Sequence, residues 1–316
     1  MSILTKLDAK DFEKILSYYS IGKYKSHKHV SWALGNTIYF IKTDAGKFVL
    51  KVFENSDPNF IAYQLKLYDI VIKNKLPVPR TILTKTKQRL LFFNKKRIII
   101  QEFIDGHHPK KLSAKLIIDI ARNQSKMNKA FLKLKLKNKY NWGGDYHFRL
   151  MSFNVKKFDD FDIRKEEKDT LKELRKINKT KLRRSSVHGD FHSVNLLVKK
   201  NKLKAILDWD DAHEDYLIHD LVCFMAHSFI KIKNIYRKQI KLYLKEYQKT
   251  LKLNPEEKKA VYFFIKQRYL AAISWQIKQI KKHKDIRNII ERNIRKDIKK
   301  YKNFSKSAVE TFLNSF

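Results

Sequence analysis

Two short apolar runs separated by a polar segment constrain this chain more strongly than any other feature of its sequence. The runs occupy residues 196–198 and 205–207, and the lysine-rich segment between them is centred on Asn201 and Lys202. Short apolar runs joined by a polar turn are typical of a β-hairpin. We therefore expect a hairpin here, with the residues that flank its two runs close together in space.

Polar residues occupy the open end of this predicted hairpin. Pairing the runs about the turn places Leu196 opposite Leu207, and Asn195 opposite Asp208. An amide oxygen beside a carboxylate suits Mg²⁺, which binds oxygen ligands, keeps several waters and needs only one or two protein groups. Asp190 lies in the loop that enters the first strand. A surface hairpin with polar ends would explain any one of these residues, but three of them bracketing a hairpin favour a functional site.

The order of these residues is also that of a phosphoryl-transfer loop, His-x-Asp-x-x-x-x-Asn followed by a second aspartate. In such a loop the first aspartate accepts the proton of the attacking hydroxyl, while the asparagine and the second aspartate hold Mg²⁺ on the nucleotide phosphates. The sequence therefore predicts Asp190 as the catalytic residue and Asn195 and Asp208 as the metal ligands, with His188 in a supporting role.

The segments around these residues resemble a known family. Residues 188–195 (HGDFHSVN) and 206–212 (ILDWDDA) are similar to the two signatures of the aminoglycoside phosphotransferase and choline kinase superfamily, which includes type II homoserine kinases and spore-coat kinase-like proteins. The resemblance extends over about residues 38–229 and implies an α+β, protein-kinase-like bilobal fold. A small N-terminal lobe, residues 1–104, would carry an antiparallel sheet, one main helix and the nucleotide. The larger, mostly helical lobe, residues 105–316, would carry the catalytic hairpin and the substrate.

The N-terminal lobe is expected to contain the nucleotide site. Residues 37–43 and 47–53 have the composition of two strands joined by a turn. Lys51 shares a strand face with apolar neighbours and therefore needs a partner. The resemblance implies that this hairpin covers ATP, with Gly35 near the phosphates and Lys51 on the α- and β-phosphates. A single glycine stands here where the family has a glycine-rich loop.

A second departure from the family lies in the helix predicted for residues 57–74. The family places an acid in this helix to pair with the strand lysine. The matching position here is Gln64, which could hydrogen-bond Lys51 but could not neutralise its charge. The resemblance also implies a segment whose backbone binds the adenine edge where the lobes join: Glu102, Phe103 and Ile104.

The charge of the chain is large and unevenly distributed. Lysine and arginine make up 70 of the 316 residues and give a net charge of +38. Nucleic acid, a membrane surface or ATP could use such charge. The chain has no RNA-binding motif, arginine-rich arm or basic repeat interleaved with aromatic residues. We therefore expect no dedicated nucleic-acid partner, and only non-specific binding of polyanions at low salt.

By contrast, residues 205–230 contain no lysine or arginine and several carboxylates. Clustered carboxylates need a metal, an ammonium group or internal donors to offset their repulsion. Asp220 could either brace the catalytic loop or touch a ligand. Four further acids near the predicted metal ligands are candidates to bind an ammonium group of the substrate: Asp210, Asp211, Glu214 and Asp215.

Composition also limits the class of protein. Hydrophobic residues make up 43% of the chain and aromatic residues 13%, which argues against disorder. The sequence contains neither an apolar run of ~18 residues nor a signal-peptide core. Cys223 is the single cysteine and lies in an apolar run, so it predicts a buried thiol. These features favour a cytoplasmic protein without a membrane span.

The rest of the second lobe has mainly helical patterns. Apolar residues recur at helix spacing from residue 117 to residue 132, and residues 164–178 predict a charged helix exposed to solvent. Residues 138–162 suggest an irregular insertion near the substrate. Three more helices are expected toward the C-terminus, at residues 217–232, 234–252 and 256–283.

Together these features predict a kinase that uses ATP and Mg²⁺ to phosphorylate a hydroxyl of a small, amine-bearing metabolite, in the manner of homoserine, choline or aminoglycoside kinases. The alternative is a catalytically weak or inactive kinase-like protein that binds nucleotide or acts as a scaffold. Gln64 and the lone Gly35 favour the alternative, whereas Asp190, Asn195 and Asp208 favour the enzyme.

Overall fold

The chain is described by a computed structural model in which residues 5–30, 35–54, 57–134, 157–282 and 286–305 are placed. Contacts within the chain separate it into two compact units. The first unit comprises Met1–Ala62 and Val78–Gly106, and the second comprises Tyr63–Pro77 and His107–Phe316. The second unit therefore includes most of the helix that follows the first strands. The lobe boundary expected after residue 104 stays a prediction.

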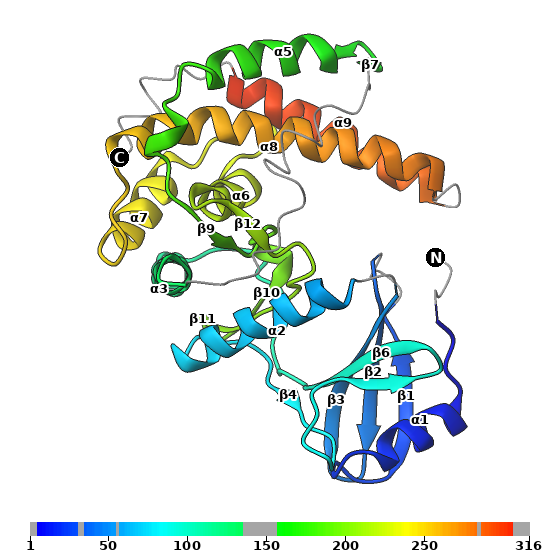
Figure 1. Cartoon of the computed structure of the whole chain (residues 1–316). Coiled ribbons are helices and arrows are strands. Elements are labelled where there is room, and N and C mark those ends of the chain that lie inside the picture. Colours follow the sequence, from blue (N-terminus) through cyan, green and yellow to red (C-terminus); the bar gives the residue numbers. More distant parts are fainter. Residues whose placement is uncertain (1–4, 31–34, 55–56, 135–156, 283–285, 306–316) are drawn as a thin grey trace. The chain divides into compact units, whose positions relative to one another are not determined.

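The first unit is built on one antiparallel sheet (Figure 1). Its strands run in the order β1-β2-β3-β6-β4, and β5 also pairs with β6. The two strands expected at residues 37–43 and 47–53 are present as β2 and β3. The bounds of the strands are β1 Tyr24–His29, β2 Thr37–Thr43, β3 Gly46–Phe53, β4 Thr81–Ile82, β5 Leu91–Phe93 and β6 Lys96–Glu102.

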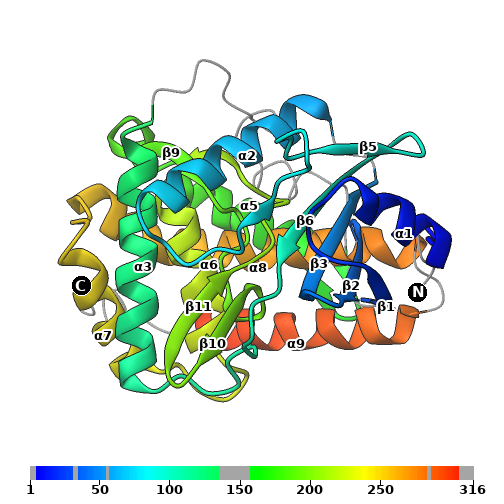
Figure 2. The same ribbon diagram turned by 90° about the horizontal axis from the view of Figure 1, so that it is seen from below.

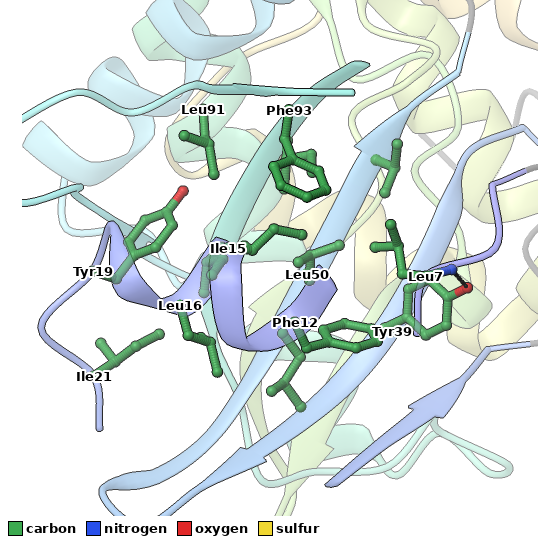
Figure 3. Close-up of a cluster of buried hydrophobic side chains, with 14 residues drawn as sticks. Leu7, Phe12, Ile15, Leu16, Tyr19, Ile21, Tyr39, Leu50, Leu91 and Phe93 are labelled. Carbon is green, nitrogen blue, oxygen red and sulfur yellow. Dashed lines mark hydrogen bonds between the residues drawn. The ribbon is translucent and has the colours of Figure 1, made fainter. Parts of the chain in front are cut away.

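The core of the first unit lies between this sheet and helix α1, Ala9–Ser17 (Figure 3). Asp8 and Asp11 form a reciprocal capping box that starts the helix. Alternate residues of the central strands point to the helix because successive side chains leave a strand on opposite faces. The residues that the sheet contributes to this core are Tyr39, Ile41, Leu50, Val52, Leu91, Phe93, Ile98 and Ile100.

The second unit is mainly helical. In it α3 packs against α7, and α8 lies beside α9 (Figure 1 and Figure 2). The helix predicted for residues 57–74 is present as α2, and the three helices expected toward the C-terminus are present as α6, α7 and α8. The bounds of the helices are α2 Pro58–Lys73, α3 Ala114–Leu132, α5 Ile163–Leu174, α6 Ile218–Phe229, α7 Arg237–Gln248, α8 Pro255–Lys282 and α9 Arg287–Ser305.

The described residues of the second unit also form short strand pairs and two turns of 3-10 helix. Strand β9 precedes the predicted catalytic segment, and its partner β12 follows it. The pair β10–β11 lies within the segment. The bounds are β7 Lys157–Phe158, β8 Phe161–Asp162, β9 Arg184–Val187, β10 Leu196–Lys199, β11 Lys202–Ile206, β12 His213–Tyr216, η1 Lys179–Lys181 and η2 Ser193–Asn195.

The predicted hairpin is present as β10–β11, but its predicted register is wrong. Leu196 pairs with Ile206 rather than with Leu207. The turn is centred on Lys200 and Asn201, both with positive φ, as a tight two-residue hairpin turn requires. Lys204 is an extra, bulged residue between the pairs formed by Leu197 and Val198. The earlier turn and the bulge together shift the open end by one residue.

Other expectations for the second unit have mixed outcomes. Cys223 is buried, as predicted. The charged helix of residues 164–178 is α5, but it is not wholly solvated, since Glu167 is buried in it. Most of the insertion expected at residues 138–162 lies outside the described residues. Within the part of the chain that is described, no helix is both long and apolar enough to cross a membrane.

Candidate active site

A buried carboxylate, Asp220, accepts hydrogen bonds from the backbone of the loop that carries Asp190. Asp220, at the start of α6, accepts hydrogen bonds from the backbone N–H groups of His188 at 2.9 Å and Gly189 at 3.0 Å. It also accepts one from the side-chain amide of Asn128 at 3.1 Å. Burial raises the pKa of Asp220, and these donors oppose the rise. Of the two roles left open for Asp220, the geometry supports the brace.

Gly189 allows the loop to approach a neighbouring turn closely. Its φ is +82°, and a Cβ atom there would lie 2.1 Å from the backbone oxygen of Asp211. The same oxygen lies 2.6 Å from Nδ1 of His213, which donates to it. Only glycine fits this position, because both the backbone conformation and the space exclude a side chain.

His188 joins the two motifs. Its ring is fully buried, and Nε2 donates to the backbone oxygen of Leu207 at 2.9 Å. The backbone N–H of Asp190 donates to Nδ1 of the same ring at 3.3 Å. Burial lowers the pKa of His188, which favours the neutral ring with its proton on Nε2. The histidine therefore connects the loop of Asp190 to the residue that precedes Asp208.

The two predicted metal ligands are close in the hairpin despite the shifted register. The N–H of Leu207 donates to the backbone oxygen of Asn195 at 2.8 Å, and Asp208 follows directly. The Asn195 amide nitrogen donates to Asp190 Oδ2 at 2.9 Å and to the Asp190 backbone oxygen at 2.9 Å. Its side-chain oxygen is then the atom left to accept. Asp208 is exposed and has a φ of +56°.

These oxygens suit Mg²⁺, which prefers amide and carboxylate oxygen. Two protein ligands do not fill its octahedral shell, so phosphate and water oxygens would have to complete it. In the described residues there is no group of three or more His, Cys, Asp or Glu side chains that could hold a metal by itself. The roles of Asn195 and Asp208 as metal ligands therefore stay predictions that their chemistry fits.

Asp190 is bound by residues that the sequence analysis did not select. Arg268 of α8 donates from Nη2 to Asp190 Oδ1 at 2.7 Å, and His192 Nε2 lies 2.9 Å from Asp190 Oδ2. The thiol of Cys223 lies 3.9 Å from Oδ1. Burial acts to raise the pKa of Asp190, but His192 and Arg268 outweigh it and hold this pKa well below its usual range.

The four acids proposed for an ammonium group have different surroundings. Asp215 is fully buried, and its carboxylate lies 3.1 Å from Nε2 of His213. Glu214 lies 4.0 Å from Arg184 on the paired strand. Asp211 is half-buried, and burial together with the charges of Asp190 and Asp210 raises its pKa to about 6. A cationic partner near Asp211 would therefore stabilise its charged form.

Gln64 contacts the turn that follows Asp208. Its Nε2 donates to the backbone oxygen of Trp209 at 2.8 Å and to Asp210 Oδ1 at 3.2 Å. The side chain is buried in α2. An amide can donate in this way and a carboxylate cannot. The structure therefore gives a local reason for glutamine at this position.

The residues expected to bind nucleotide in the first unit form a separate group. Lys51 lies in β3 between Ile38 of β2 and Ile99 of β6, with Nζ 4.9 Å from the ring centre of Phe53. Gly35 is exposed.

The expected adenine-binding segment follows β6. The backbone N–H of Glu102 donates to the oxygen of Arg80 at 3.0 Å, so that group already has a partner. The ring of Phe103 packs edge-on against Phe40, and Ile104 is half-buried. The roles of these residues, and those of Lys51 and Gly35, stay predictions.

Comparison with known proteins identifies relatives of this arrangement. A model of the phosphotransferase enzyme family matches residues 28–251. A homoserine kinase of Pseudomonas aeruginosa (strain LESB58) is 25% identical over 114 residues, 36% of this chain and 36% of that protein, so the match spans about a third of the relative. A homoserine kinase of Zymomonas mobilis subsp. mobilis is 22% identical over 289 residues, 87% of this chain and 89% of the relative.

Solved structures share the fold over nearly the whole chain. An amicoumacin kinase, hAmiN, in complex with AMP-PNP, Ca²⁺ and Ami, has a TM-score of 0.72 at 12% identity and covers 96% of this chain and 95% of its own. A microcompartment-associated aminopropanol kinase has a TM-score of 0.72 at 14% identity and covers 98% and 100%. These likenesses confirm the kinase-like α+β fold, and the family match confirms the resemblance noted in the sequence.

Proposed function

Because the chain belongs to the phosphotransferase enzyme family, we propose that it transfers the γ-phosphoryl group of ATP to a hydroxyl of a small molecule. One observation carries the proposal: Asp190 and Asn195 are hydrogen-bonded to each other, and His188 ties them to the strand end that precedes Asp208. Asp190 and Asn195 thus belong to one connected set of hydrogen bonds, which also holds the backbone of Leu207 directly before Asp208.

Asp190 would orient the acceptor hydroxyl and take up its proton. Its low pKa makes it a weak base, which suits a loose transition state in which the hydroxyl loses its proton late. Holding the hydroxyl in line with the phosphoryl group then contributes more than proton abstraction does. Asn195 fixes the Asp190 carboxylate through Nδ2 and keeps its own oxygen for a metal.

The nucleotide would be bound as its Mg²⁺ complex. Asn195 and Asp208 are the proposed protein ligands, and the ion would neutralise phosphate charge as the γ-phosphoryl group leaves. Lys51 is the proposed contact for the α- and β-phosphates, and Gly35 lies before the strand that leads to it. The backbone at Phe103 and Ile104 is the proposed adenine contact, with Glu102 contributing less because its N–H is already bonded.

For the acceptor we propose a small alcohol that also carries an amine. Asp211, whose pKa is raised to about 6, would gain from an ammonium group nearby, and Asp210 would add to the attraction. Glu214 and Asp215 already have internal partners and contribute less. Relatives named homoserine kinase and an aminopropanol kinase of similar fold act on alcohols of this kind by name.

The alternative is a kinase-like protein that binds nucleotide without efficient turnover. Gln64 favours it, since the family has an acid at this position. The hydrogen bond that Gln64 donates to the Trp209 backbone oxygen weakens this support for the alternative, because it gives the glutamine a structural role that an ionised acid could not fill. The alternative predicts ATP binding with no acceptor-dependent release of ADP.

The decisive experiment is a coupled assay of ADP release with ATP and Mg²⁺ over homoserine, 3-aminopropanol, choline, ethanolamine, aminoglycosides and sugars. We expect one class of acceptor to stimulate turnover, and Asp190→Asn to reduce kcat by about 10²-fold or more. Asp169→Asn is the matched control, since it makes the same change at an exposed position of α5. Absence of ATP binding would overturn the proposal, and binding without turnover would support the alternative.

A further inference from the structure

Arg268 reaches Asp190 from a helix that is distant in sequence. It lies within α8, 78 residues beyond Asp190, and their side chains are 14% and 22% exposed. Its neighbours Gln267, Tyr269 and Leu270 are buried, so the backbone that carries the guanidinium is fixed by packing. The ion pair therefore joins the Asp190 carboxylate to a well-packed element of the second unit.

The charge of Arg268 offsets a local excess of negative charge. Burial and the negative charges of Asp190 and Asp210 raise the pKa of Asp211, whereas the positive charge of Arg268 lowers it. Among the ion pairs of the described residues, Asp190 is joined to His192 and Arg268. Arginine is charged at every working pH, whereas histidine is charged only when it is protonated. Arg268 is thus the permanent positive charge of these two.

The geometry also fixes the orientation of the carboxylate. Oδ2 of Asp190 accepts from Asn195 and contacts His192, and Oδ1 accepts from Arg268. Each oxygen therefore has a strong partner, and rotation of the carboxylate would break several contacts at once. Among the described residues, loss of Arg268 would leave Oδ1 with the thiol of Cys223 at 3.9 Å, which is a weak donor.

We propose that Arg268 is a positioning residue that holds the Asp190 carboxylate in the orientation that receives the acceptor hydroxyl. Its kinetic consequence rests on the proposed phosphoryl transfer, whereas the energetic coupling of the two residues does not. The two parts are therefore tested separately.

The coupling is tested by a double-mutant cycle on the full chain, with urea unfolding as the measurement. Arg268→Ala is combined with Asp190→Asn. We expect Arg268→Ala to raise the equilibrium constant of unfolding in both backgrounds. The rise should be at least about fivefold larger in the wild-type background than in the Asp190→Asn background. The control cycle pairs Arg122→Ala with Asp190→Asn; Arg122 is bonded to Glu246 instead, and its effect should add independently. Coupling below about twofold for Arg268 would overturn the inference.

The positioning role is tested by kinetics with the best acceptor. Arg268→Ala should lower kcat by about 10²-fold through misplacement of Asp190, with KM for ATP changed by less than about threefold. Arg268→Lys should recover part of the loss, and added guanidinium should rescue Arg268→Ala. Arg183→Ala is the matched control, because it removes another Arg–carboxylate pair, formed with the buried Glu257. It should lower thermal stability, leave kcat unchanged and show no rescue.

The outcomes distinguish the two proposals. Wild-type turnover with an unchanged kcat in Arg268→Ala would overturn the positioning role and leave the proposed function standing. Absence of wild-type turnover with every acceptor would overturn the proposed function and, with it, the kinetic role of Arg268. Loss of kcat together with guanidinium rescue would support both.

Discussion

Gln64 of α2 donates its side-chain amide to the backbone oxygen of Trp209 at 2.8 Å, one residue beyond Asp208. A glutamate at this position would present only acceptors to that oxygen and to the Asp210 carboxylate. The glutamine is therefore suited to the turn that follows the predicted metal ligand, whatever its consequence for Lys51.

Gln64→Glu tests this relationship. We expect it to lower the free energy of unfolding by about 1–3 kcal/mol, because a buried donor is replaced by an acceptor that faces two other acceptors. Urea unfolding measures the change, and Gln88→Glu, the same substitution at an exposed site, is the control. A Gln64→Glu variant that is as stable as the wild type and turns over faster would show instead that glutamine is a catalytic handicap.

Gly189→Ala should damage the loop that carries Asp190. A Cβ atom would lie 2.1 Å from the Asp211 backbone oxygen, and the φ of +82° adds strain of about 1–3 kcal/mol. Gly35→Ala is the matched control, since its Cβ would meet no atom within 4 Å. Thermal unfolding of the two variants should differ clearly. Equal stability would mean that the loop moves to accept a side chain.

Glu167 should make stability depend on pH. Burial raises its pKa to about 7, against the hydrogen bond from Ser274, while the ordinary value is 4.5. Between these values the folded state keeps a proton that the unfolded state releases. The associated stability is therefore complete below pH 4.5 and is lost as the pH rises through about 7.

Glu167→Gln should accordingly leave stability near pH 4.5 almost unchanged. At pH 8 it should raise the free energy of unfolding by on the order of 2 kcal/mol, since the neutral amide has no charge to bury. Urea unfolding over this pH range measures the difference, with Asp169→Asn on the same helix as control. An identical pH profile for wild type and Glu167→Gln would contradict the assignment.

Nucleotide binding should depend on Asn195 and Asp208. With Mg²⁺·ADP at about 100 times Kd, the wild type should gain about 2.7 kcal/mol of stability. Asn195→Ala and Asp208→Asn should each lose most of this gain, and chelation of Mg²⁺ should abolish it in the wild type. Thermal shift with and without EDTA is the measurement. A full Mg²⁺·ADP shift in both variants would exclude these residues as metal ligands.

The sequence predicted the elements of this site better than their contacts. The hairpin at β10–β11 follows from two apolar runs and a polar turn, and its existence was predicted. Its register was not, because Lys200 and Asn201 adopt positive φ without a glycine to mark the turn, and the bulge at Lys204 has no sequence signal. Local composition indicates where a hairpin forms, whereas the exact pairing depends on backbone geometry.

Arg268 shows a different limit. Lysine and arginine make up 70 of 316 residues, so one arginine in α8 carries no distinguishing signal. Its contact with Asp190 spans 78 residues and exists only once the helices have packed. His192, by contrast, could have been identified from the sequence, since it lies in the same motif as Asp190. A second histidine two residues after the predicted base was the signal that could have identified it.

The lone thiol of Cys223 offers a use that follows from its place beside Asp190. Burial raises the pKa of this thiol to about 12, so the folded protein presents almost no thiolate to an alkylating reagent. Reagent can reach it only when α6 and the loop above it separate. The rate of labelling therefore reports the rate at which the catalytic loop opens spontaneously. A cysteine introduced on the surface would react before Cys223 does, so it could be labelled selectively.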